Sequence, residues 1–276
     1  MAITSETVKQ LREKTGAGMM DCKKALEATD GDMNAAVDYL RKKGAAIAEK
    51  RSDRAANQGI VVSKLSDDAK KGIIIEVNCE TDFVARGDDF VVFANTIADI
   101  IFKHTPADLD TLKTISYEGT KNVADALSDM MGKIGERIEI KKFSIVTAVN
   151  GFVESYIHMG SKIGVIVEMQ GEFTPANKTL ARDIAMQVAA MSPIVVSREE
   201  VSKELIDREM EIYRQQAKNE GKPEAIAEKI STGRLEKYYQ EVVLLEQSFI
   251  KDAGKTVRDL VSPNISIRQF KRYQLG

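Results

Sequence analysis

One pattern constrains the fold of this chain more than any other, because it occurs twice in the sequence. Residues 59–62 (GIVV) precede residues 72–77 (GIIIEV), and residues 151–154 (GFVE) precede residues 164–169 (GVIVEM). In each copy the first glycine lies 13 positions before the second (72 − 59 and 164 − 151), and a glutamate follows the second glycine after four positions. Both copies have the form strand, turn, strand, which predicts a β-hairpin.

Each hairpin is followed by a segment with helical periodicity and, later, by a third strand. The closing strands are predicted at residues 137–143 and 264–270, which share the pattern Ile-x-Ile-basic-x-Phe. Three strands covered by helices can form a stable unit, whereas an isolated hairpin is marginal. We therefore expect an α+β protein with two related subdomains, each with a small antiparallel sheet and helices. The apolar positions of the two helices are Phe93, Ile97, Ile100 and Ile101 in the first copy and Leu180, Ile184, Val188 and Met191 in the second.

The spacing of apolar residues and glycines predicts a helical bundle before the first copy. Ser5 can cap a first helix that ends at Gly16, a second helix spans about residues 20–29, and a third begins near Asp32. Three short helices with tight glycine turns predict a three-helix bundle of the ubiquitin-associated type. Its core is only marginal, because about forty residues bury little apolar surface.

The predicted organisation has four parts and one insertion. An N-terminal bundle covers residues 1–45, a linker helix residues 46–57, and the two core subdomains residues 58–147 and 148–276. Dense charges, an apolar stripe and a Gly-Lys-Pro turn predict an antiparallel helical hairpin inserted at about residues 197–238. Its charges are interpreted as a solvated face, while its apolar stripe leaves self-association open as an alternative.

Composition limits the classes of function. The formal net charge is −2 and there is no Trp, so neither a global basic field nor a base-stacking platform favours nucleic-acid binding. Two distant cysteines, Cys22 and Cys79, indicate a reducing, cytoplasmic compartment. The first residues are not typical of a signal peptide, and no apolar run reaches the length of a membrane span.

The sequence offers no constellation of catalytic residues. It has no Gly-x-x-x-x-Gly-Lys-Ser/Thr phosphate loop, no Cys-x-x-Cys pair and two histidines, His104 and His158. Cys79 directly follows an apolar strand, which favours a small buried side chain over a nucleophile. We therefore expect no catalytic residue, no metal site, no cofactor and no enzyme activity.

Residues 78–86 (NCETDFVAR) connect a predicted buried strand to a predicted helix. Phe83 beside the carboxylate of Asp82 is either a packing detail or a probe for a partner, and Asp82 by itself would most often cap the helix. A similar choice arises at Met19 and Met20, which either fill gaps in the core or form an adaptable docking surface. These residues alone leave both choices open.

Two long segments resemble the signatures of a known family. Residues 11–26 (LREKTGAGMMDCKKAL) and residues 76–86 (EVNCETDFVAR) resemble those of bacterial translation elongation factor Ts. Shorter similarities occur at residues 133–136, 158–165 and 184–190, and nearly the whole chain is covered. The family comprises guanine-nucleotide exchange factors of elongation factor Tu, the GTPase that delivers aminoacyl-tRNA. The resemblance implies the same helical bundle, paired core subdomains and helical hairpin.

The resemblance also implies which residues bind elongation factor Tu, in its GDP-bound and nucleotide-free forms. Asp82 and Phe83 match a pair that intrudes near the partner's magnesium and phosphate site, and His158 matches a histidine that reaches another domain of the partner. Ile134 and Gly135, which alone indicate the start of a strand, match a further contact. A factor that prefers nucleotide-free partner weakens GDP binding by the same factor, so that GTP can reload. The implied partner-binding residues are Thr81, Asp82, Phe83, Val84, Met19, Met20, Ile134, Gly135 and His158.

Two other classes of function stay open. One is an RNA- or ribosome-associated module, against which the slight net acidity counts. The other is a structural protein that oligomerises through the helical hairpin. A homodimer through the core or the hairpin is also compatible with an exchange factor, whereas direct binding of nucleotide, nucleic acid or membrane is not expected.

Overall fold

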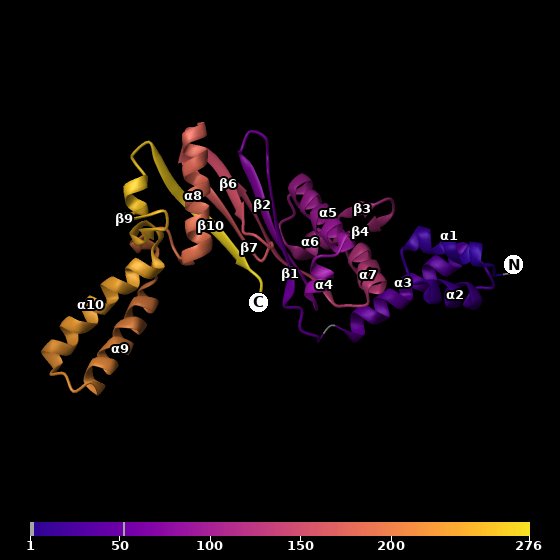
Figure 1. Ribbon diagram of the computed structural model, residues 1–276, viewed down its shortest axis with the longest axis horizontal. Coiled ribbons are helices and arrows are strands. Elements are labelled where there is room, and N and C mark those ends of the chain that lie inside the picture. Colours follow the sequence, from indigo (N-terminus) through magenta and orange to yellow (C-terminus); the bar gives the residue numbers. More distant parts are fainter. Residues whose placement is uncertain (1–2, 52) are drawn as a thin grey trace. The chain divides into compact units, whose positions relative to one another are not determined.

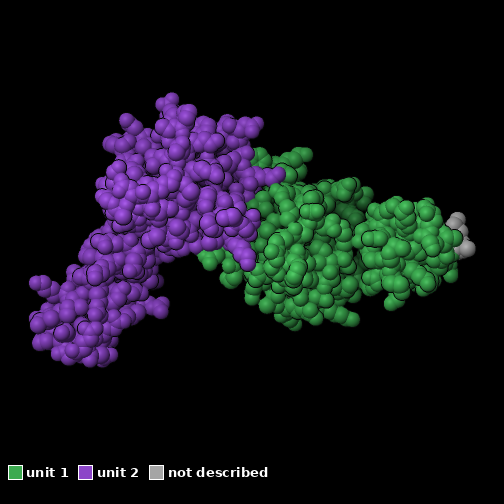
Figure 2. Space-filling view, in the orientation of Figure 1, with its two compact units in different colours: residues 1–62, 75–143, 274–276 green, residues 63–74, 144–273 purple. Residues whose placement is uncertain are grey.

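The chain folds into helices and small antiparallel sheets, which confirms the predicted α+β class (Figure 1). The computed structural model describes residues 3–51 and 53–276. The chain divides into two compact units, which Figure 2 colours separately. The four-part division predicted from the sequence stays a prediction. Unit 1 comprises residues 1–62, 75–143 and 274–276, and unit 2 comprises residues 63–74 and 144–273.

Unit 1 begins with the predicted three-helix bundle. The cap of the first helix is Thr4 rather than Ser5, because Thr7 N donates to Thr4 Oγ1 at 3.2 Å and Thr4 N donates to Thr7 Oγ1 at 3.0 Å. Gly16 ends this helix as predicted, in the left-handed conformation with φ 68°. The helices are α1 (Ser5–Thr15), α2 (Met19–Ala28) and α3 (Met33–Lys50). The buried core of the bundle consists of Val8, Leu11, Cys22, Ala25, Leu26 and Ala36.

The first copy of the repeat forms one sheet with the strand order β1-β2-β5. Both hairpin strands and the closing strand are therefore confirmed, and the central strand β2 is buried over nearly its whole length. Helix α5 buries Phe93, Ile97 and Ile101 at the predicted spacing. The elements are β1 (Gln58–Leu65), β2 (Lys71–Cys79), α4 (Asp82–Ala85), α5 (Asp88–His104), α6 (Leu109–Thr114), β3 (Ser116–Glu118), β4 (Lys121–Asn122), α7 (Val123–Ile134) and β5 (Ile138–Thr147).

The second copy repeats this arrangement, with the strand order β10-β7-β6. The closing strand again lies beside the second strand of the hairpin. Strands β6 and β7 are antiparallel, and their register runs from the pair Gly151–Gln170 to the pair Ile157–Gly164. The elements are β6 (Gly151–Ile157), β7 (Ile163–Gly171), α8 (Pro175–Met191) and β10 (Ile265–Gln274).

The first glycine of each copy lies where two strands approach too closely for a side chain. A Cβ at Gly59 would lie 2.1 Å from the carbonyl oxygen of Val77, and a Cβ at Gly151 would lie 1.8 Å from that of Met169. Distances under 3.0 Å essentially never occur for real Cβ atoms. Since Val77 and Met169 are equivalent in the two copies, the repeated glycine reflects a repeated backbone geometry.

Helix α8 differs from its prediction at one position. Met191 is exposed, although the pattern placed it with the buried Val188 on the apolar face. The same helix buries a polar side chain, Gln187, whose amide nitrogen donates to Ser248 O at 3.1 Å. The amide oxygen of Gln187 accepts from Ile250 N at 2.8 Å. These hydrogen bonds satisfy the buried amide and tie α8 to the segment that follows the helical hairpin.

The helical hairpin inserted in the second copy is confirmed. Its charges were predicted to form a solvated face, but some of them also link the two arms of the hairpin. Arg214 on α9 pairs with Glu228 on α10 at 2.7 Å, and Arg234 on α10 pairs with Glu220, the cap of α9, at 2.8 Å. The apolar stripe is incomplete, since Ile226 is half exposed. The elements are η1 (Arg198–Glu200), α9 (Lys203–Asn219), α10 (Glu224–Val242), η2 (Leu244–Glu246), β8 (Ser248–Phe249), β9 (Asp252–Thr256) and η3 (Val257–Leu260).

Candidate partner-binding site

A single helical turn, α4, follows strand β2 and carries Asp82 and Phe83. Thr81 caps this turn, because its hydroxyl oxygen accepts a hydrogen bond from Val84 N at 3.4 Å. The predicted capping role of Asp82 is therefore wrong. Asp82 lies inside the turn and forms an ion pair with Arg86, four residues later.

The side chain of Phe83 points into solvent, with 81% of its surface exposed. The interpretation as a packing residue is therefore wrong, since only the opposite face of the turn, at Ala85, is buried. The guanidinium carbon of Arg86 lies 5.9 Å from the centre of the Phe83 ring. Burying such a side chain is worth about 1.5–3 kcal/mol, and Phe83 can gain this free energy only against another surface.

The connector between α7 and β5 holds the α4 turn in place. Thr81 N donates to Glu136 Oε2 at 3.0 Å, and Thr81 Oγ1 donates to Glu136 Oε1 at 2.7 Å. In the opposite direction, Arg137 N donates to Glu80 Oε1 at 2.6 Å. The two connectors thus exchange hydrogen bonds through their carboxylates. Sequence reasoning missed Glu80 and Glu136, because these partners lie 55 and 57 residues apart and no local pattern links them.

Glu80 also receives two guanidinium groups, from Arg51 at 2.8 Å and Arg54 at 3.2 Å. Desolvation by burial raises the pKa of this carboxyl group. The hydrogen bonds from Arg137 N, Arg51 and Arg54 together outweigh that effect, so the pKa of Glu80 lies below its ordinary value. The carboxylate therefore stays ionised at neutral pH and keeps its hydrogen bonds strong.

The end of helix α7 brings a second predicted pair to the α4 turn. Ile134 is the last residue of α7, and Gly135 caps the helix with φ 78°. Their interpretation as the start of a strand is therefore wrong, because β5 begins three residues later, at Ile138. Ile134 and Phe83 line one shallow surface hollow, together with Phe90.

Met19 and Met20 are the first residues of helix α2, and both are exposed, to 43% and 65%. Their interpretation as fillers of core gaps is therefore wrong. The turn before them lies close to α7, because a Cβ at Gly16 would lie only 3.0 Å from the side chain of Lys133.

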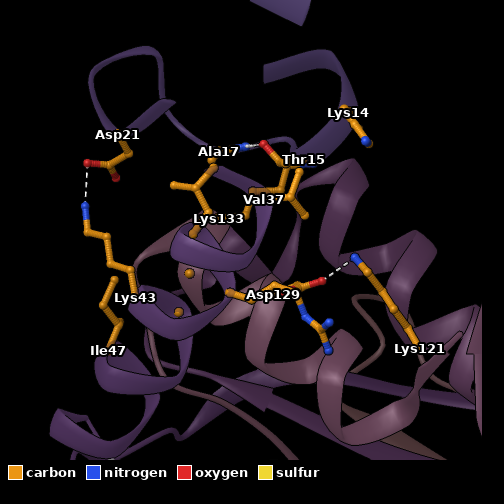
Figure 3. Close-up of a pocket in the computed structure, with 14 residues that line it drawn as sticks. Lys14, Thr15, Ala17, Asp21, Val37, Lys43, Ile47, Lys121, Asp129 and Lys133 are labelled. Carbon is orange, nitrogen blue, oxygen red and sulfur yellow. Dashed lines mark hydrogen bonds and ion pairs between the residues drawn. The ribbon is translucent and has the colours of Figure 1, made fainter. Parts of the chain in front are cut away.

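A cavity of about 160 Å³ lies between the bundle and α7 (Figure 3). Beside it the two backbones touch, since a Cβ at Gly132 would lie 3.0 Å from the Cα atom of Gly44. Helix α3 runs through Gly44 without a break, and this contact attaches the bundle to α7. Two ion pairs line the cavity, namely Lys43–Asp21 and Lys121–Asp129.

His158 belongs to unit 2, whereas the other predicted partner-binding residues belong to unit 1. It is exposed in the turn between β6 and β7, where its Nδ1 lies 2.8 Å from the hydroxyl oxygen of Tyr156. The next residue, Met159, is 90% exposed. Sequence reasoning missed Met159, although an apolar residue in a polar turn is a usable signal.

The thiol of Cys79 is fully buried, as predicted, and donates to the carbonyl oxygen of Thr81 at 3.1 Å. Desolvation, with a smaller contribution from the charge of Glu136, raises its pKa to about 12. Within residues 3–51 and 53–276 we find no group of three His, Cys, Asp or Glu side chains that could hold a metal ion. In the same described part of the chain, no helix is both long and apolar enough to cross a bilayer.

Comparison with known proteins identifies the family. The family model described as Elongation factor TS matches residues 80–276. The chain belongs to the elongation factor Ts family. The Elongation factor Ts of Prosthecochloris aestuarii is 52% identical over 99% of both chains, and that of Chlorobaculum tepidum is 51% identical over 99% of both. The Elongation factor Ts of Chloroherpeton thalassium is 50% identical over 99% of this chain and 98% of its own.

Membership of the elongation factor Ts family indicates the general function of the protein. The family implies an elongation factor of protein biosynthesis that binds elongation factor Tu and exchanges its nucleotide. Such a factor is not a catalytic enzyme in the usual sense. The matched residues 80–276 include the α4 turn, the α7–β5 connector and the turn with His158, while the relatives extend the similarity over the bundle.

Proposed function

We propose that this chain binds elongation factor Tu in its GDP-bound and nucleotide-free states and displaces Mg²⁺ and GDP with a wedge formed by Asp82 and Phe83. GTP can then reload during translation elongation. The observation that carries the proposal is the exposed Phe83 beside a carboxylate, on a turn whose backbone is tied down. A rigid, protruding aromatic side chain fits a role in which it enters an apolar pocket of the GTPase.

Asp82 acts in this proposal through its charge. In the free protein its carboxylate pairs with Arg86, and both side chains are at least half exposed. An exposed ion pair contributes little stability, so the carboxylate can leave it at low cost. Negative charge placed near the bound phosphates repels them and competes for their magnesium ion, which disfavours both ligands.

The remaining contacts provide binding area at separate points. The proposed partner-binding set is Thr81, Asp82, Phe83, Val84, Met19, Met20, Ile134, Gly135 and His158. Preference for the nucleotide-free partner then weakens GDP binding by the same factor, because the two affinities are linked thermodynamically. Attachment at several points lets the wedge distort the nucleotide site without loss of the complex.

The test is the rate at which a fluorescent GDP leaves elongation factor Tu after addition of this protein. We expect Phe83→Ala to fold normally and to lose most of the acceleration. Val149→Ala is the matched control, because Val149 is 83% exposed and lies outside the proposed set. The wedge is refuted by a folded Phe83→Ala variant that exchanges as fast as the wild type. A wild-type protein without acceleration refutes the exchange function itself.

Self-association is a second candidate, and the helical hairpin favours it. Ile212 on α9 and Ile226 on α10 expose 38% and 50% of their surfaces. Sedimentation of the wild type and of an Ile212→Glu, Ile226→Glu double variant tests whether this surface supports a homodimer. A wild-type protein that sediments as a monomer at all concentrations excludes it. We propose no direct binding of nucleotide, nucleic acid or membrane.

A further inference from the structure

Every hydrogen-bonding group of Thr81 has a partner inside the protein, although the residue lies at the surface. Its amide and its hydroxyl donate to the two carboxylate oxygens of Glu136, at 3.0 and 2.7 Å. Its hydroxyl oxygen accepts from Val84 N at 3.4 Å, and its carbonyl oxygen accepts from Ala85 N at 3.2 Å. Both hydrogen-bond donors of Thr81 are thus used inside the protein, on a single carboxylate.

The α4 turn needs such external ties because it is too short to hold its own shape. It spans four residues, Asp82–Ala85, and fixing the first turn of a helix costs more conformational entropy than its hydrogen bonds return. The bidentate contact with Glu136 fixes the residue from which the turn starts. The reverse contact, from Arg137 N to Glu80 at 2.6 Å, fixes the preceding residue on the same connector.

Glu136 directly follows Gly135, the cap of α7, and Ile134, the last residue of that helix. The same hydrogen bonds therefore set the position of Phe83 relative to Ile134, and these two side chains line one hollow. We propose that Thr81 and Glu136 form a positioning clasp for the wedge, so that Thr81 belongs to the partner-binding set through its hold on Asp82 and Phe83 and not through a contact of its own with the partner. This inference rests on the proposed exchange function for its effect on rate, but the clasp itself can be tested without the partner.

The first experiment measures GDP release from elongation factor Tu over a range of factor concentrations. We expect Thr81→Val and Glu136→Ala each to lower the maximal release rate by about tenfold, as for loss of a charge-assisted hydrogen bond. The double variant should be no slower than either single one, and Thr81→Ser, which keeps the hydroxyl, should retain the wild-type rate. Glu172→Ala, which removes an exposed carboxylate at the corresponding connection of the second copy, is the control.

Additive losses in the double variant, or an equal loss in Thr81→Ser, would show that Thr81 touches the partner directly and would overturn the clasp. Unchanged rates in both single variants would overturn it as well. If a variant needs a higher concentration for half-maximal release but reaches the wild-type maximal rate, it has lost binding area. That result would also count against a positioning role.

The second experiment is amide hydrogen exchange on the free protein, which separates the clasp from the exchange function. In Glu136→Ala we expect faster exchange at residues 81–85, with strand β2 and helix α5 unchanged. Unchanged protection at residues 81–85 overturns the clasp, whatever the nucleotide assay shows. If the wild type fails to release GDP while Glu136→Ala still loses this protection, the proposed function fails and the clasp stands.

Discussion

Replacement of Gly151 by alanine tests the steric reason for the repeat. The added Cβ would lie 1.8 Å from the carbonyl oxygen of Met169, whereas ordinary contacts begin at 3.4 Å. Strands β6 and β7 must therefore separate by 1.6 Å at this point (3.4 − 1.8). Such a shift breaks neighbouring backbone hydrogen bonds and leaves buried groups unpaired, at about 1–3 kcal/mol for each group. With one or two groups affected, we expect the free energy of unfolding to fall by about 2–4 kcal/mol.

Urea unfolding followed by circular dichroism measures this loss. The matched control is Gly233→Ala, because a Cβ there meets nothing within 4 Å and the residue lies inside helix α10. That variant should be more stable by up to about 1 kcal/mol, since alanine favours a helix over glycine. If Gly151→Ala unfolds at the same urea concentration as the wild type, the strands have room for a side chain and our explanation of the repeated glycine is wrong.

Three further outcomes depend on single residues. The pKa of Cys79 is raised to about 12, so thiol reagents should not label the folded protein at pH 8. The stability that the neutral thiol contributes is full below pH 9.0 and is lost as the pH rises toward about 12. Rapid labelling of a folded sample would contradict this. The lowered pKa of Glu80 means that the contribution of its carboxylate to the free energy of unfolding is full above pH 4.5 and is lost as the pH falls through the folded-state pKa. The amide resonance of Arg137 should report this titration by nuclear magnetic resonance. A titration midpoint at or above pH 4.5 would contradict the lowered pKa. Gly132→Leu should lower the free energy of unfolding of unit 1 by about 1–3 kcal/mol, because the side chain must fit against Gly44; a urea midpoint equal to that of the wild type would argue against the close contact.

The repeat could be predicted because the same local geometry requires the same residue type in both copies. A glycine is required wherever a carbonyl oxygen occupies the place of a side chain, as at Gly59 and Gly151. This backbone geometry is therefore visible in the sequence as a glycine at the same position of each copy. The alternation of the closing strands and the spacing of Phe93, Ile97 and Ile101 are local in the same sense. These signals together were sufficient for the fold class and for the three strands of each sheet, but not for the order of the strands within the sheet.

The support of the candidate site was not predictable, because it depends on contacts between distant residues. Glu80 and Glu136 have no special neighbours in the sequence, and a glutamate near a threonine is common. Their role follows only from the sheet, which brings the connector after β2 beside the connector before β5. Local competition explains a smaller error, since Thr4 and Ser5 are both good caps and the reciprocal bond to Thr7 selects Thr4.

The two copies of the repeat place their phenylalanines differently, and this difference predicts a separation of stability from function. In the second copy, α8 begins directly after its cap, Thr174, and the ring of Phe173 lies 5.2 Å from that of Phe152. In the first copy the α4 turn precedes α5, and 81% of the surface of Phe83 is exposed to solvent.

Truncation of these two residues should therefore have opposite consequences. We expect Phe173→Ala to lower the free energy of unfolding by about 0.5–1.5 kcal/mol, because the contact of its ring with Phe152 is lost, and to leave GDP release from elongation factor Tu unchanged. Phe83→Ala should change the free energy of unfolding by less than about 0.5 kcal/mol and should remove most of the acceleration of GDP release. A Phe83→Ala variant that loses as much stability as Phe173→Ala would show that both rings serve packing, and the outward turn of Phe83 would then need another explanation.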